Sequence, residues 1–267
     1  MAESSQDVTS AERSIHAVRA IRQVLHAIWA LSRAQLPLVE HAASAAAVYQ
    51  HWVDRAVERI AGAPRVPSGA RVLHVVFGPE RPFSGALARR VADAIPAEGD
   101  IGLVGRRLAE TVAQSRELDA RVRFRCPGSV AHDDLHDVAL TVAGHILTHG
   151  RGGVTVVLHP AEGPSGMAHA SLIGARVPVD RPPETFGRLG LVVVAAVREA
   201  MTGRLAVAAV EALRAEVRAR MIAADAARRA CDERLAELES VWHSRRREAI
   251  TRELLEAVAG REAMRSL

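Results

Sequence analysis

The chain has 267 residues, of which 49% are hydrophobic, and its 35 basic residues, all arginine, leave a net charge of only +4. This small surplus argues against a nucleic-acid surface, and a GC-rich genome explains the arginine usage better than a binding function does. Two isolated cysteines exclude a disulfide framework, and the longest uncharged apolar run, residues 189–197, is too short to span a bilayer. We therefore expect no direct membrane insertion. The polar residues 1–12 also predict no signal peptide.

A long helix is predicted over residues 10–61, with Ser10 as its N-cap and Glu12 in its electropositive first turn. Apolar residues recur along it at intervals of three and four, which is typical of a narrow helical stripe. The stripe contains Val18, Ile21, Leu25 and Ile28. A stripe of this kind needs a partner helix to cover it.

An α/β domain is predicted over residues 70–185, after a linker rich in Pro and Gly. Apolar strand patterns alternate with helical patterns, and this alternation predicts a small parallel sheet covered by helices. The expected strands are 71–77, 101–104, 120–124 and 153–158, and the expected helices are 83–95, 106–115 and 131–148. Residues 159–183, rich in Gly and Pro, are expected to form a loop.

The last segment, residues 190–262, is predicted to be a second long helix, helical without a break from about 205 to 258. Its apolar stripe contains Leu213, Val217, Met221, Leu235, Leu238 and Trp242. A helix of about 54 residues would reach roughly 80 Å, about twice the diameter of a domain of this size. We therefore expect it to project from the domain and to form an antiparallel coiled coil with residues 10–61.

Few residues suggest catalysis or metal binding. His132 with His136, and His145 with His149, have the i, i+4 spacing of zinc ligands on a helix, but no third ligand at a tight spacing completes either pair. The run 150–153 precedes a strand, whereas phosphate-binding loops follow one. We predict no catalytic residue, no metal and no cofactor.

The end of the chain resembles the gamma subunit of F-type ATP synthases. The resemblance covers about sixty residues. Its motifs are Arg220-Met221-x-Ala223 and Arg246-Arg247-Glu248-Ala249-Ile250-Thr251-Arg252-Glu253-Leu254, followed by Val258 and Gly260. Weaker similarity lies at Glu80 and Gly85, and Glu216 is the one residue kept from a Ser-Glu-Asn triplet of the family. Arg247 stands where the family has glutamine, which suggests a divergent branch, with the alternative sodium-translocating type as one candidate.

The resemblance implies a non-catalytic rotor subunit that couples transmembrane proton or sodium flow to ATP synthesis or hydrolysis. The implied partners are the alpha and beta subunits, the epsilon subunit and the membrane c-ring, with no nucleic acid. The implied location is peripheral, on the cytoplasmic face of the cell membrane. The implied beta-subunit contacts are Arg246, Arg247, Thr251, Glu253, Glu256 and Ile28.

Two other functional classes remain open at this point. A coiled-coil adaptor outside any rotary complex would share the helical period, and an α/β enzyme would share the central domain. A gamma subunit should be encoded beside the genes for alpha and beta subunits, and this arrangement separates the three hypotheses.

Overall fold

The computed structural model describes residues 2–62, 64–65, 71–150, 153–162, 166–173, 175–176, 179, 184 and 187–265. Two long helices, α1 (Ala2–Ala61) and α6 (Leu189–Arg265), stand at the two ends of the described sequence. Between them follow β1 (Pro64–Arg65), β2 (Val72–Phe77), α2 (Leu87–Asp93), β3 (Asp100–Val104), α3 (Arg106–Val112), α4 (Arg116–Ala120), β4 (Val122–Cys126), α5 (Leu135–His149), β5 (Val154–Pro160), β6 (Met167–Ile173) and β7 (Ala175–Arg176). The predicted fold, two long helices with a small α/β domain between them in the sequence, is confirmed.

The chain divides into two compact units. One unit, here called the helical unit, comprises Met1–Leu31 and Met221–Leu267. The other, here called the sheet unit, comprises Ser32–Arg220. Helices α1 and α6 each contribute residues to both units.

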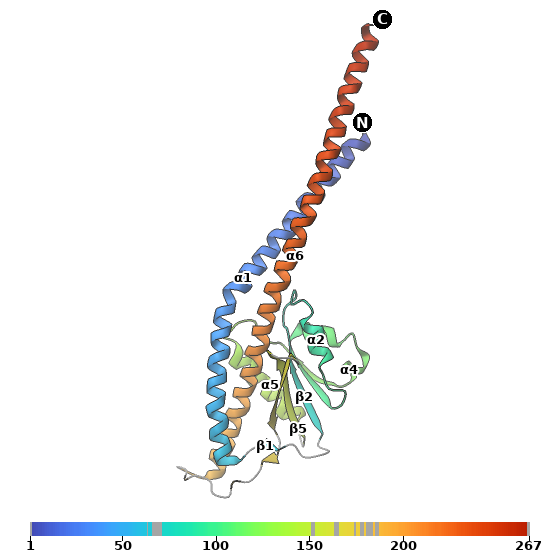
Figure 1. Cartoon of the computed structure of the whole chain (residues 1–267). Coiled ribbons are helices and arrows are strands. Elements are labelled where there is room, and N and C mark those ends of the chain that lie inside the picture. Colours follow the sequence, from blue (N-terminus) through green and yellow to red (C-terminus); the bar gives the residue numbers. More distant parts are fainter. Residues whose placement is uncertain are drawn as a thin grey trace. The chain divides into compact units, whose positions relative to one another are not determined.

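A five-stranded sheet, in the order β4-β3-β2-β5-β6, forms the centre of the sheet unit. Its strands β2 and β5 lie side by side in Figure 1. Strands β4, β3, β2 and β5 are parallel, whereas β6 pairs antiparallel with β5. The sheet is therefore mixed: the predicted parallel strands form most of it, and β6 adds an antiparallel strand at one edge. The short strands β1 and β7 form a separate antiparallel pair.

The two faces of the sheet are covered by different helices. One face packs against α5 and the first part of α6 through a buried cluster that includes Phe77, Val142 and Leu205. The other face packs against α2 and α3 through Val76, Val91 and Leu108. Because strands β2 and β3 are apolar on both faces, as buried parallel strands are, their sequences predicted them well.

Several predicted boundaries differ from the structure. Strand β6 lies inside the expected loop 159–183. The amide of Ala161 donates to the carbonyl of Gly166, and from there the chain runs back antiparallel to β5 as β6. The expected helix 106–115 ends at Val112, and a second short helix, α4, follows it, with Ser115 as its N-cap accepting a hydrogen bond from the Leu118 amide. Helix α1 already begins at Ala2, so Ser10 lies inside it and is not its N-cap. It also continues through Pro37 without interruption.

Candidate functional site

The two long helices pair antiparallel within the helical unit. The indole of Trp242 donates to Glu12 at 3.1 Å, and Arg19 forms an ion pair with Glu239 at 2.7 Å. Farther along α1, Arg22 forms an ion pair with Asp232. Residue numbers rise on one helix as they fall on the other, which is the antiparallel arrangement that the stripes predicted.

The predicted seam residues of the helical unit are buried to different extents. Leu25 is buried, and Val18, Ile28, Met221, Leu235, Leu238 and Trp242 are half-buried. Ile21 is 54% exposed, so its assignment to the seam was wrong. The spacing by threes and fours is followed by Ile15, Val18, Arg22 and Leu25. Arg22, although about half exposed itself, forms the ion pair with Asp232 across the two helices.

The same two helices also pair within the sheet unit. Val39 and Ala43 on α1 pack against Val210, Leu213 and Val217 on α6. Leu213 and Val217, the two predicted seam residues that belong to the sheet unit, therefore lie in one buried cluster. An ion pair between Asp54 and Arg204 at 2.7 Å borders this helix pair.

The predicted beta-contact residues of α6 lie at the surface of the helical unit. The side chains of Arg246, Arg247, Thr251, Glu253 and Glu256 are exposed. The Arg246 guanidinium lies 5.0 Å from the centre of the Trp242 ring, within the range of a cation–π contact. The Thr251 hydroxyl donates to the Arg247 carbonyl at 2.9 Å, so it has only acceptor capacity left for a partner.

Two buried carboxylates connect α6 to loops of the sheet. Glu216, only 2% exposed, accepts hydrogen bonds from the backbone amides of Glu80 at 2.7 Å and Arg81 at 3.1 Å. Glu80, 5% exposed, in turn accepts from the backbone amides of Arg106 at 2.7 Å and Gly128 at 2.9 Å. We call Glu80 and Glu216 with these donors the carboxylate junction.

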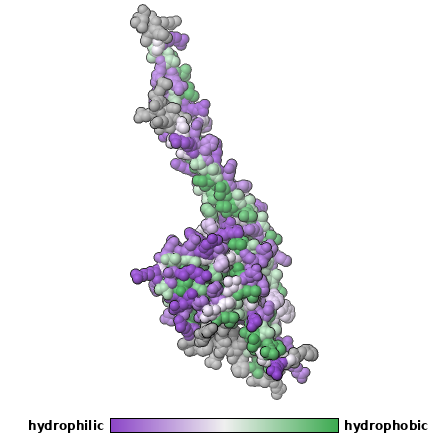
Figure 2. Space-filling model, turned by 180° about the vertical axis from the view of Figure 1, so that it is seen from behind, coloured by the Kyte–Doolittle hydropathy of each residue, from purple (hydrophilic) through white to green (hydrophobic). Residues whose placement is uncertain are grey.

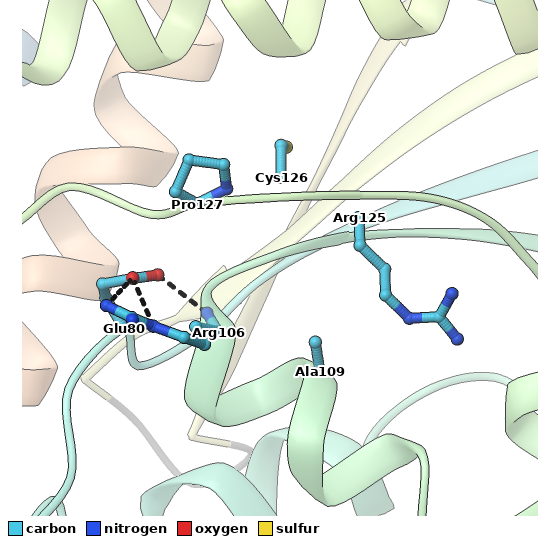
Figure 3. A pocket seen from close by; sticks show the side chains of 6 residues that line it. All are labelled: Glu80, Arg106, Ala109, Arg125, Cys126 and Pro127. Carbon is cyan, nitrogen blue, oxygen red and sulfur yellow. Dashed lines mark hydrogen bonds and ion pairs between the residues drawn. The ribbon is translucent and has the colours of Figure 1, made fainter.

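Figure 3 shows Glu80 with its bonds to the amide and the guanidinium of Arg106. A shallow hollow of about 500 Å³ lies beside this pair, and Ala109, Arg125, Cys126 and Pro127 complete its lining. The guanidinium of Arg125 points away from Glu80 in this view and forms an ion pair with Asp119. The hollow therefore has an apolar centre and a basic rim whose charges are already paired.

Burial controls the protonation behaviour of this region. Desolvation raises the pKa of Glu216, although the amides of Glu80 and Arg81 and the charge of Arg220 oppose the shift. Burial, followed by the nearby charge of Glu80, raises the pKa of Cys126 to about 12. The Cys126 thiol donates to the Leu103 carbonyl at 3.6 Å. A thiol of this kind is structural and not a nucleophile.

The histidines of α5 pack against an aromatic ring. His145 stacks on Phe124 with ring centres 4.9 Å apart, and His149 lies 5.5 Å from the same ring. Among the described residues, no group of three or more His, Cys, Asp or Glu side chains is arranged to hold a metal ion. In the same part of the chain, no helix combines the length and the apolar character that crossing a membrane requires.

Solved structures resemble this chain over most of its length. A chain of the Euglena gracilis mitochondrial ATP synthase, in a structure of OSCP, F1 and the c-ring, matches with a TM-score of 0.71 and 14% identity over 97% of this chain and 95% of that one. A chain from a structure of the rotor of the same enzyme matches with a TM-score of 0.64 and 14% identity, over 92% of this chain and 99% of that one. This chain has the fold of ATP synthase rotor and central-stalk chains.

The likeness extends to a third solved structure. A chain of the Tetrahymena thermophila mitochondrial ATP synthase, from its central stalk and c-ring, matches with a TM-score of 0.59 and 13% identity over 76% of this chain and 99% of that one. Comparison with protein families and with curated proteins finds no match. The fold is thus similar to that of these central-stalk chains although the sequences are only 13–14% identical.

Sequence reasoning did not predict the carboxylate junction. It noted Glu80 and Glu216 only as residues shared with a family. A local signal was present, because Glu216 is an acid within the apolar stretch 205–217 of α6, where a charge requires a partner. The identity of that partner depended on the fold, which brings residues 80 and 216 together.

Proposed function

We propose that the chain is the gamma-type central stalk subunit of an F-type ATP synthase, coupling transmembrane proton or sodium flow to ATP synthesis or hydrolysis. The observation that carries the proposal is the likeness, with a TM-score of 0.71 over 97% of the chain, to a chain of a rotary ATP synthase. The antiparallel pairing of α1 and α6 fits this role, because a stalk that transmits torque needs paired helices for stiffness.

In this proposal the chain catalyses no reaction itself. Residues 10–61 and 190–262 form the axle, residues 70–185 form the base, and the alpha and beta subunits surround the axle. Each orientation of an asymmetric axle favours a different conformation of each beta subunit, so rotation shifts their populations. The base binds the epsilon subunit and the c-ring, at the cytoplasmic face of the cell membrane.

The surface chemistry of the helices fits this role. Apolar side chains reach the surface along both long helices (Figure 2), including Leu38, Val48 and Trp52 on α1 and Ile250 and Leu254 on α6. In this proposal the alpha and beta subunits cover these exposed apolar side chains. Arg246, Arg247, Glu253 and Glu256 supply the polar contacts to a beta-subunit loop, with Thr251 as an acceptor. Ile28, on α1 beyond the Arg22–Asp232 pair, supplies a separate apolar contact.

Reconstitution with alpha and beta subunits from the same source tests the proposal. We expect one copy of the chain to join each alpha–beta hexamer during size-exclusion chromatography and to raise its ATP hydrolysis. Arg247→Gln should change turnover of the complex, because a charge-assisted contact is roughly twice as strong as a neutral one. Arg234→Gln, which removes an exposed pair with Glu237 on the same helix, is the matched control.

Failure to join a hexamer would refute the proposal. A chain that instead binds unrelated helical proteins would act as a coiled-coil adaptor. A chain with activity of its own on a small substrate would be an α/β enzyme.

A further inference from the structure

Three loops that are distant in the sequence meet at the carboxylate junction. Glu80 follows strand β2, Arg106 follows β3, and Gly128 follows β4. Since the carboxyl ends of neighbouring parallel strands lie at the same edge of a sheet, all three loops belong to one edge. Glu216 on α6 bonds directly to the first loop and, through Glu80, indirectly to the other two.

All four carboxylate oxygens of the junction have donors. One oxygen of Glu80 accepts from the amides of Arg106 and Gly128, and the other accepts from the Arg106 guanidinium at 2.9 Å and 3.1 Å. The two oxygens of Glu216 accept one amide each, from Glu80 and Arg81. Losing either carboxylate would leave two backbone amides without their acceptor, and burial makes such a loss costly.

Tight packing allows the loops little movement. Gly105 has a φ of 119°, and a Cβ there would lie 2.5 Å from the Gly78 carbonyl oxygen. A Cβ at Gly78 would lie 2.8 Å from Cδ2 of Leu108. The loops after β2 and β3 are therefore in direct contact, and they accommodate no side chain at these two positions.

Apolar packing alone would not fix α6 against the sheet. Met201, Leu205 and Ala208 bury this helix against one sheet face, and the hydrophobic effect that favours this burial has no preferred direction. Hydrogen bonds depend steeply on distance and angle. The two amide bonds of Glu216 therefore give α6 a directional contact with the loop after β2, in addition to the bond that Arg204 of the same helix donates to the Ser171 carbonyl of β6.

We propose that Glu216 and Glu80 are positioning residues that lock the α/β domain to helix α6, so that torque passes between them without slippage. The role in torque rests on the proposed function. The lock itself is a property of the single chain and can be tested without any partner.

The first experiment measures backbone hydrogen exchange in the full-length chain by mass spectrometry. Glu216→Ala should accelerate exchange of residues 78–84 by about tenfold or more, with smaller acceleration at 104–108 and 127–130. Glu211→Ala is the matched control, because Glu211 lies on the same helix and pairs only with Arg214 one turn away among the described ion pairs. Glu211→Ala should leave the exchange rates of all three segments unchanged. Equal exchange in both variants would overturn the lock.

Glu216→Gln covers the case in which Glu216→Ala fails to fold. The amide side chain keeps one acceptor oxygen and loses the other, so we expect intermediate acceleration confined to residues 78–84. If residues 78–84 of Glu216→Gln exchanged at the wild-type rate, this result would also overturn the lock.

The second experiment measures ion pumping for each ATP hydrolysed, using the assembled enzyme in sealed vesicles. Glu216→Gln should hydrolyse ATP at a rate near that of the wild type but pump at least about twofold fewer ions per ATP, whereas Glu211→Ala should match the wild type. Normal pumping by a variant with accelerated exchange would overturn the role in torque. If the wild-type chain joins no complex, the proposed function fails, while the exchange experiment still decides the lock.

Discussion

The helical unit and the sheet unit use the same two helices but stabilise them in opposite ways. In the helical unit, α1 and α6 meet along a narrow seam in which a few side chains, such as Ile15 and Leu25, are buried and most are half-buried. Ion pairs such as Arg19–Glu239, which remain about half exposed, border this seam. In the sheet unit, the same helices contact a buried core and a buried carboxylate. A single helix can thus be part of a weakly stabilised pair in one region and a strongly stabilised core in another.

The difference follows from the neighbours available to each turn of the helix. A two-helix pair covers only one stripe of each helix, so much of the apolar surface of Ile21, Val24 and Leu254 stays in contact with water. A helix that also packs against a sheet has most of its circumference covered, as Leu205 and Val210 are. Substitutions should therefore have unequal effects in the two units.

The largest expected effect is in the sheet unit. Leu205→Ala should lower the free energy of unfolding by about 3 kcal/mol, because it removes a fully buried side chain and leaves a cavity. Leu255→Ala, on the same helix but 65% exposed in the helical unit, should change it by less than about 0.5 kcal/mol. Chemical denaturation of both variants measures the contrast, and similar losses would contradict it.

The next effect tests the carboxylate that joins two loops. Glu80→Ala should cost about 2 to 3 kcal/mol of stability, because it leaves the buried amides of Arg106 and Gly128 without an acceptor. Glu110→Ala removes only an exposed pair with Arg107 and should cost less than about 0.5 kcal/mol. Thermal unfolding followed by circular dichroism compares the two, and an equally small loss would show that water replaces the Glu80 carboxylate.

A smaller effect should depend on pH. Burial, and next the positive charge of Arg121, lowers the pKa of His74 from 6.5, with His169 adding to the shift and a backbone hydrogen bond to Glu98 opposing it. Above pH 6.5 the imidazole is neutral in both the folded and the unfolded chain. Between pH 6.5 and the lowered pKa only the unfolded chain takes up the proton, so stability should fall as the pH falls through this range, by at most about 1.4 kcal/mol per pH unit.

Comparison of wild type with His74→Leu at pH 7.5 and 5.5 isolates this contribution. The wild type should lose more stability than the variant on acidification. His51→Gln, at an exposed position on α1, should behave like the wild type. An equal loss in wild type and His74→Leu would assign the pH dependence to other groups.

The smallest effect is expected at the ion pairs of the helical unit. Glu239→Gln should weaken the pair with Arg19 and cost about 0.2 to 1 kcal/mol, as exposed ion pairs do. Because salt screens such pairs, the difference from wild type should nearly vanish in 1 M salt. Hydrogen exchange of residues 12–25 at low and high salt measures the stability loss and its salt dependence. A difference between Glu239→Gln and wild type that persists in 1 M salt would show a packing role for Glu239.

Local patterns predicted the elements but not the long-range contacts. The three-four spacing on both long helices and the alternation of strands and helices came from side-chain periodicity, which the sequence displays directly. Strand β6 was missed because its residues, Met-Ala-His-Ala-Ser-Leu-Ile, become a strand only by pairing with β5. Ile21 was misassigned because apolar spacing alone does not show which side chains a single partner helix covers; the neighbouring Arg22 forms the ion pair with Asp232 across the two helices.

The carboxylate junction lay beyond local patterns for a related reason. Its acceptor and donors are separated by 135 and 136 residues, so nothing in the neighbourhood of either carboxylate identifies the other. A buried acid could be recognised as needing a partner, but only the topology of the sheet brings the loop after β2 to α6.

The protection of Cys126 has a practical consequence for single-molecule work. With its pKa raised to about 12, roughly one Cys126 side chain in ten thousand is a thiolate at pH 8, and the group is also buried. Cys231 is the other cysteine and lies half-buried on α6 in the helical unit. A maleimide dye should therefore attach to Cys231 alone, giving the native chain one fluorescent reporter on its helix pair without any cysteine having to be replaced.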